Sequence, residues 1–135
     1  MKSIHSLFLL ALLPFFSISC SNNESQQEAV IETVSITDFI AHMKDEGAVI
    51  VDVRTDEEVA EGMIPGAVRI EFDTPEMEAE FKKLDLSAPV LVYCHLGGRS
   101  GRTKDMLAEW GFMQVYDLDG GIMAWQGVGE EVVSP

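Results

Sequence analysis

Short apolar runs alternate with amphipathic segments from Val30 onward. The β-branched runs at 48–53 and 89–93 contain few polar residues, as expected of strands that are buried on both faces. Shorter apolar runs at 67–70 and 115–118 indicate two further strands. This alternation predicts an α/β fold in which a central, mostly parallel sheet is flanked by helices on both faces.

The segments between these strands carry helix start and stop signals. Thr37 and Gly47 enclose a short predicted helix, and Thr55 and Glu58 have the spacing of a capping box at the start of the next one. The remaining helices are predicted at 74–84 with Pro75 in the first turn, at 100–110 before Gly111, and at 120–125 as a closing helix.

The N-terminal segment differs from the rest of the chain. Lys2 precedes a largely apolar stretch at 7–16, which is too short to span a membrane but typical of a secretory signal peptide. Small residues lead up to Cys20, a pattern that resembles a bacterial lipoprotein signal, in which the chain is cut before the cysteine and the cysteine is lipidated. An ordinary cleaved secretion signal is the alternative.

These features divide the chain into a lipoprotein-type signal peptide (1–19), a flexible tether (20–30) and one folded domain (31–135). The tether is polar and of low complexity, and the remaining length suits a single core. With Cys20 lipidated, we expect an exported protein, anchored by its lipid on the periplasmic side of a bacterial cell-envelope membrane.

Charge restricts the partners of this chain. The net charge is −14, and only nine Lys and Arg are spread along the sequence. A basic stripe that could follow a phosphate backbone is missing, so we expect no nucleic-acid partner. The acidity also repels anionic ligands, which means that any anion site has to be created by local structure.

Cys20 and Cys94 are the only cysteines. If Cys20 is lipidated, Cys94 has no disulfide partner, and a free thiol in an oxidising compartment favours a reactive role. A free cysteine packed in the core is the alternative, and the cysteine count does not separate the two.

A compact motif follows Cys94. Gly97 and Gly98 let the backbone curl so that its N–H groups can point inward, the next helix adds its positive end, and Arg99 adds a full charge. Together they favour the thiolate, which is the nucleophilic form. In the structural alternative, Cys94 is a buried strand-end residue, the glycines form a tight turn and Arg99 is solvated. Arg suits a helix N-terminus only when it faces an anion, which favours a functional loop.

The sequence resembles the rhodanese family over residues 34–125. The matching stretches are Cys94–Ser100 for the active loop C-x-x-G-x-R-S, Asp52–Arg54 for D-V-R, 61–67 for G-H-I-P-G-A, and 118–125 for L-x-G-G-x-x-x-W. The resemblance implies a sulfurtransferase in which Cys94 takes sulfane sulfur, as a persulfide, from thiosulfate or another persulfide source and passes it to a thiol or cyanide.

The same resemblance implies which residues bind the donor and the persulfide. They are Arg99 and the loop residues His95, Leu96, Gly97, Gly98 and Ser100. Two positions depart from the family pattern: Met63 stands where the family commonly has His, and His95 where many active loops have a second Arg. The first concerns packing, whereas the second weakens the positive field of the loop.

Asp52 and Arg54 follow a buried strand and are interpreted as structural support of the site, because a carboxylate at a strand end commonly pins nearby loops through an Arg pair. No two His or Cys residues have metal-ligand spacing, so we expect neither a metal nor another cofactor.

Two other functions remain open. Phosphatases and arsenate reductases resemble this chain and use Cys and Arg around an anion, but they generally place five residues between the two, whereas four separate Cys94 from Arg99. The domain could also be a non-enzymatic sulfur carrier or an interaction module for an exported redox protein, because a carrier and a transferase need the same loop.

Overall fold

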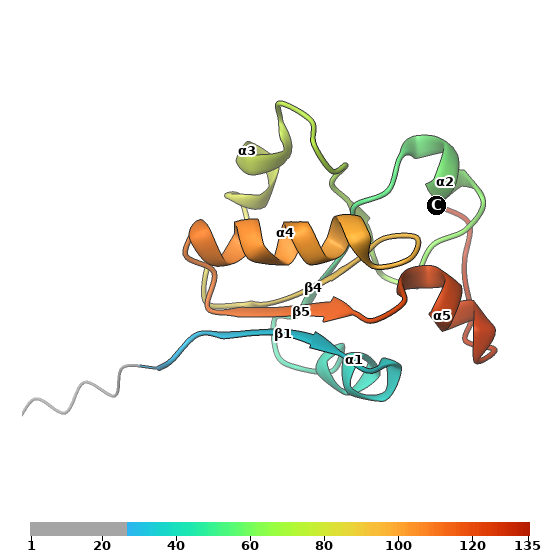
Figure 1. The fold of residues 1–135 in the computed structure, drawn as a ribbon, viewed down its shortest axis with the longest axis horizontal. Coiled ribbons are helices and arrows are strands. Elements are labelled where there is room, and N and C mark those ends of the chain that lie inside the picture. Colours follow the sequence, from blue (N-terminus) through green and yellow to red (C-terminus); the bar gives the residue numbers. More distant parts are fainter. Residues whose placement is uncertain (1–26) are drawn as a thin grey trace, which may run out of the picture.

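The computed structural model describes residues 27–135 (Figure 1). The predicted signal peptide and Cys20 lie outside the described residues. The strands are β1 (Val30–Val34), β2 (Val49–Asp52), β3 (Val68–Arg69), β4 (Pro89–Tyr93) and β5 (Gln114–Leu118). The helices are α1 (Ile36–His42), α2 (Asp56–Ala60), α3 (Met77–Phe81), α4 (Gly98–Glu109) and α5 (Gly121–Gly127). The first strand begins at Val30, the last residue of the predicted tether.

The five strands form one parallel sheet in the order β1-β5-β4-β2-β3, which confirms the predicted fold class. The most buried strand, β4, lies between β2 and β5, and all five of its side chains are buried. Because the strands are parallel, their carboxyl ends meet at one edge of the sheet, where the loops after β2, β4 and β5 come together.

Side chains of β4 alternate between two hydrophobic cores. Val90 and Val92 point to the face covered by α3 and α4, where Phe81 and Leu107 pack. On the other face, Leu91 belongs to a cluster that contains buried side chains of α1 and α5. Figure 1 shows α3 and α4 on one side of the sheet and α1 on the other. Burial on both faces explains why this strand has a continuous apolar sequence.

Three local predictions differ from the structure. Ser35, not Thr37, caps α1, because its hydroxyl accepts the N–H of Asp38 at 3.2 Å. The helix predicted over 74–84 is shorter in the structure, where only α3 (Met77–Phe81) is helical. A tight turn, in which Asp73 has a φ of 61°, precedes it. The sequence pattern does not predict β1, because its Glu32 and Thr33 are exposed at the sheet edge and interrupt the apolar run.

The C-terminal segment packs back onto the turn after α2. Met63 and Val133 exchange two backbone hydrogen bonds of 2.9 Å, and the Trp125 indole donates to the carbonyl of Glu131 at 2.8 Å. Met63 is therefore a buried packing residue, consistent with the structural role expected for this turn. Within residues 27–135, no helix is both long enough and apolar enough to cross a membrane.

Candidate active site

Cys94 follows β4 directly and lies at the carboxyl edge of the sheet. It is a free cysteine with only 1% of its surface exposed. The strand is held on both sides at this point, because the Val53 N–H donates to the Tyr93 carbonyl at 3.1 Å and β5 pairs along the other edge. The sulfur therefore has a fixed position at the sheet edge where α/β folds place their sites.

The loop after Cys94 curls around the sulfur. Gly97 has a φ of 105°, a left-handed conformation that glycine adopts without strain, and its N–H points at Sγ over 3.0 Å. The Ser100 hydroxyl lies 3.4 Å from the same sulfur. Because α4 begins at Gly98 and runs for 12 residues, its positive end is also directed at this region.

These contacts set the protonation of the thiol. Burial by itself raises the pKa of Cys94, but hydrogen bonds from the Ser100 hydroxyl and from backbone N–H groups of the loop outweigh it and bring the pKa below its usual value. Hydrogen bonds to the charged form favour that form. The site thus holds a buried sulfur that ionises more readily than an ordinary cysteine.

A second chain segment forms the floor beneath the loop. The N–H groups of Ile122 and Met123, at the start of α5, donate to the carbonyls of Cys94 and His95 at 2.9 and 3.2 Å. A Cβ on Gly121 would come within 2.5 Å of the Cys94 carbonyl oxygen, and the φ of this glycine is 59°. The close approach requires glycine, which gives a physical reason for the Gly-Gly pair in the closing motif.

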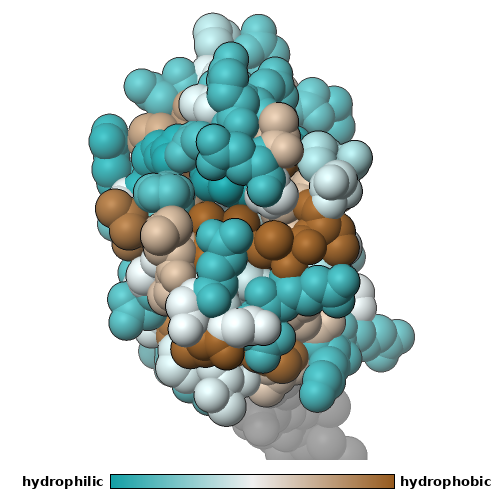
Figure 2. Space-filling view, turned by 90° about the vertical axis from the view of Figure 1, so that its right-hand side faces the viewer, coloured by the Kyte–Doolittle hydropathy of each residue, from teal (hydrophilic) through white to brown (hydrophobic). Residues whose placement is uncertain are grey.

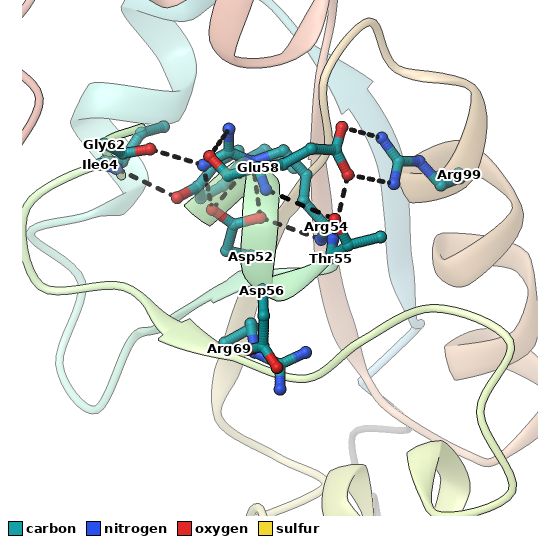
Figure 3. Close-up of polar contacts among 10 residues, drawn as sticks. Asp52, Arg54, Thr55, Asp56, Glu58, Gly62, Ile64, Arg69 and Arg99 are labelled. Atoms are coloured by element: carbon teal, nitrogen blue, oxygen red, sulfur yellow. Dashed lines mark hydrogen bonds and ion pairs between the residues drawn. The ribbon is translucent and has the colours of Figure 1, made fainter. Parts of the chain in front are cut away.

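Arg99 forms a bidentate ion pair with Glu58 of α2. Its Nη1 and Nη2 donate to Oε2 and Oε1 over 2.7 and 2.6 Å, and both side chains are partly exposed (Figure 3). Hydrogen bonds from Arg99 are the main cause that lowers the pKa of Glu58 to about 2. The predicted capping box at Thr55 is present, but its Glu58 has this second role, which the sequence does not indicate.

Asp52 and Arg54 form a buried ion pair, in which Nη2 and Nε of Arg54 donate to the carboxylate over 2.7 to 3.1 Å. The same guanidinium donates to the carbonyls of Glu58 and Gly62, which ties the end of β2 to α2 and to the turn that follows it (Figure 3). The pair is thus a buried structural contact, and its role as a support of the site stays a prediction. Neither side chain is hydrogen-bonded to Cys94.

The outer side of the loop is apolar and accessible. Leu96 is 68% exposed, and Met123 of α5 is also exposed next to it in the fold, since its N–H bonds to His95. Figure 2 looks onto the end of the molecule that carries α2, α5 and this loop, and it shows hydrophobic surface in the middle of a hydrophilic face. Of the loop residues proposed from the sequence, Leu96 is therefore available as a surface contact.

Asp117 of β5 is a buried group near the site that the sequence analysis missed. Only 2% of its surface is exposed, and burial raises the pKa of its carboxyl. Thr33 donates to Oδ2 at 3.0 Å and in turn accepts from Lys104, whereas Oδ1 has no partner among the described residues. The parallel register places it beside Val92, two residues before the nucleophile. Asp117 lies within a short, mostly apolar run that predicts a strand, and nothing in that run indicates a buried carboxyl near the site.

Comparison with known proteins places this arrangement in a family. The sequence pattern of the Rhodanese-like domain matches residues 35–127. The chain belongs to the rhodanese-like domain family. Among solved structures, a rhodanese-related protein from Thermoplasma volcanium is similar, with a TM-score of 0.67 and 26% identity, covering 76% of this chain and 97% of that one.

Several proteins that are similar in sequence to this rhodanese-like domain are named as sulfurtransferases. A Bacillus subtilis protein with the name "Putative sulfurtransferase YtwF" is 45% identical over 84 residues, which cover 62% of this chain and 78% of that protein. The thiosulfate sulfurtransferase GlpE of Pseudomonas fluorescens is 37% identical over 84 residues, covering 62% and 75%. These relatives support sulfurtransferase activity in general for this chain.

Proposed function

We propose that this rhodanese-like domain transfers sulfane sulfur from a donor such as thiosulfate to a thiol or cyanide through a persulfide on Cys94. In the first half-reaction the Cys94 thiolate attacks the terminal sulfur of the donor. One S–S bond forms as the donor's S–S bond breaks, and with thiosulfate the leaving group is sulfite. In the second half-reaction the acceptor attacks the outer sulfur and the Cys94 thiolate leaves, so no oxidant or metal takes part.

The observation that carries this proposal is the pair of donors directed at Sγ, the Gly97 N–H at 3.0 Å and the Ser100 hydroxyl at 3.4 Å. They favour a thiolate before the reaction and stabilise the negative charge that returns to this sulfur when the persulfide is discharged.

Phosphatase or arsenate reductase activity has less support. Those reactions need a positive cradle around a tetrahedral oxyanion, and here the only arginine of the loop is paired with Glu58. The spacing of four residues between Cys94 and Arg99 also gives a smaller loop. Hydrolysis of an aryl phosphate that depends on Cys94 would reverse this ranking.

The test is sulfur loading followed by intact mass measurement. The purified protein is incubated with thiosulfate and, separately, with a small alkyl persulfide, and it is compared with Cys94→Ser. We expect a gain of one sulfur atom that is lost in Cys94→Ser and is removed by a thiol reductant. Absence of a Cys94-dependent adduct with both donors would disprove the proposed function.

Turnover separates an enzyme from a carrier. A transferase releases sulfur repeatedly to cyanide or a small thiol, whereas a carrier forms the same adduct but discharges it only to a partner, such as an exported redox protein. We expect repeated turnover with at least one small acceptor. Adduct formation without turnover would favour the carrier instead.

We also propose that the protein is exported and held at the periplasmic side of a bacterial envelope membrane by a lipid on Cys20. The support is the apolar stretch at 7–16, followed by small residues before Cys20. In a bacterial host, labelling with a fatty-acid analogue should be lost in Cys20→Ala. Labelling that persists in this variant would contradict the anchor, and a secreted unlabelled protein would favour an ordinary signal peptide.

A further inference from the structure

Glu58 holds the one cation of the active loop in a fixed ion pair. Both terminal nitrogens of Arg99 are used, and the carboxylate is itself fixed, because its Oε2 also accepts the N–H of Thr55 at 3.0 Å (Figure 3). This arrangement spans two elements far apart in the sequence, α2 and the start of α4. The guanidinium is therefore presented to the site with its charge already balanced.

Two other guanidiniums near this end of the sheet are not hydrogen-bonded to the active loop. Arg54 is buried in its own ion pair, and the Arg102 guanidinium lies over the ring of Phe72 at 4.9 Å. Asp56 and Glu57 add negative charge in the same helical turn as the ion pair. A doubly charged donor thus approaches a loop in which backbone N–H groups, the Ser100 hydroxyl and a helix end attract it, on a protein with a net charge of −14.

The Arg99–Glu58 ion pair affects the binding of thiosulfate and of organic persulfides differently. Glu58 takes two of the guanidinium N–H groups of Arg99, so a thiosulfate dianion that engages the remaining ones meets a guanidinium whose charge is already balanced and is repelled by the adjacent carboxylate. The persulfide group of an organic thiol, R–S–SH, carries at most one negative charge and needs no guanidinium. Its organic group can also lie against the exposed side chains of Leu96 and Met123 beside the loop.

We propose that Glu58 determines donor selectivity, so that the Cys94 site accepts sulfur from an organic persulfide in preference to thiosulfate. This inference rests on the proposed function and specifies its donor class. The Cys94 thiolate attacks the outer sulfur of R–S–SH, the new S–S bond forms as the old one breaks, and the thiolate R–S⁻ leaves. The proton stays on the transferred sulfur, so atoms, charge and electrons balance without a co-reactant.

The experiment compares two neighbouring neutral variants of the full chain. Glu58→Gln removes the charge but keeps a side-chain oxygen that can accept from Thr55, whereas Glu57→Gln removes the same charge from an exposed position without touching Arg99. For each protein, the second-order rate constants of Cys94 sulfur loading by thiosulfate and by cysteine persulfide are measured by intact mass.

We expect the wild-type protein to load faster from cysteine persulfide. Glu58→Gln should raise the rate constant with thiosulfate about tenfold, equivalent to about 1.4 kcal/mol, and should change the persulfide rate much less. Glu57→Gln should leave the ratio of the two rates close to that of the wild type. A wild-type preference for thiosulfate, or an unchanged ratio in Glu58→Gln, would overturn the selectivity while leaving the persulfide mechanism intact. Failure of both donors to load Cys94 would overturn the proposed function as well.

Discussion

The hydroxyl oxygen of Ser100 lies 3.4 Å from the sulfur of Cys94, and the residue that carries it is completely buried in the first turn of α4. The helix that follows the loop thus contributes a side chain as well as its positive end to the nucleophile. Three chain segments converge on this sulfur: β4 delivers it, the loop and α4 donate to it, and α5 supports the carbonyls around it.

Ser100→Ala should make Cys94 a weaker nucleophile. Loss of the hydroxyl removes a hydrogen bond to the thiolate, so the pKa of Cys94 should rise and alkylation by iodoacetamide at neutral pH should slow about fivefold, for a bond worth about 1 kcal/mol. The measurement is the pH profile of the alkylation rate. Ser87→Ala, at an exposed serine that bonds to Asp85, is the control. Coincident profiles for Ser100→Ala and the wild type would exclude this role.

Gly121→Ala should damage the loop through the backbone. The added Cβ would lie within 2.6 Å of the carbonyl oxygens of Cys94 and His95, and the positive φ adds strain, so we expect a loss of about 1–3 kcal/mol in unfolding free energy. Sulfur loading of Cys94 should slow as well, because the donors move off the sulfur. Gly127→Ala in the same helix has open space and should do neither. Normal loading by Gly121→Ala would show that the floor is dispensable.

Asp52→Asn should destabilise the fold strongly. It leaves the buried guanidinium of Arg54 without its counter-charge, which typically costs about 3–5 kcal/mol of unfolding free energy. Urea unfolding followed by circular dichroism measures the change. Asp56→Asn is the matched control, because its ion pair with Arg69 involves a carboxylate that is 76% exposed, and it should cost less than about 1 kcal/mol. Equal effects of the two variants would contradict a structural role for the buried pair.

Acid should weaken the contact between α2 and the active loop. The ion pair with Arg99 lowers the pKa of Glu58 from 4.5 to about 2, so the folded state favours the charged carboxylate. Its stabilising contribution is complete above pH 4.5 and is lost as the pH falls toward 2. The thermal midpoint of Glu58→Gln should therefore lie about 1–5 °C below that of the wild type at pH 7, and the gap should close toward pH 2. A gap that stays constant with pH would argue against this linkage.

Much of this protein could be predicted from local sequence. The runs at 48–53 and 89–93 are apolar because their strands are buried on both faces, so they identify a parallel sheet. The motif from Cys94 to Ser100 predicted the curled loop and the helix start, because a glycine turn and a helix end are determined by neighbouring residues.

The tertiary structure decided which distant groups meet at that loop. Glu58 and Arg99 are 41 positions apart, and each already had a sufficient local explanation, one as a capping residue and the other as an anion binder. Asp117 looked like part of a strand, and the need for glycine at 121 comes from a carbonyl on another segment. Side-chain pairing and close backbone contacts depend on how the strands are ordered in the sheet. Local patterns in the sequence therefore led to the proposal of Cys94 as the sulfur nucleophile, and only the folded chain showed that Arg99 of its loop is already bound to a carboxylate.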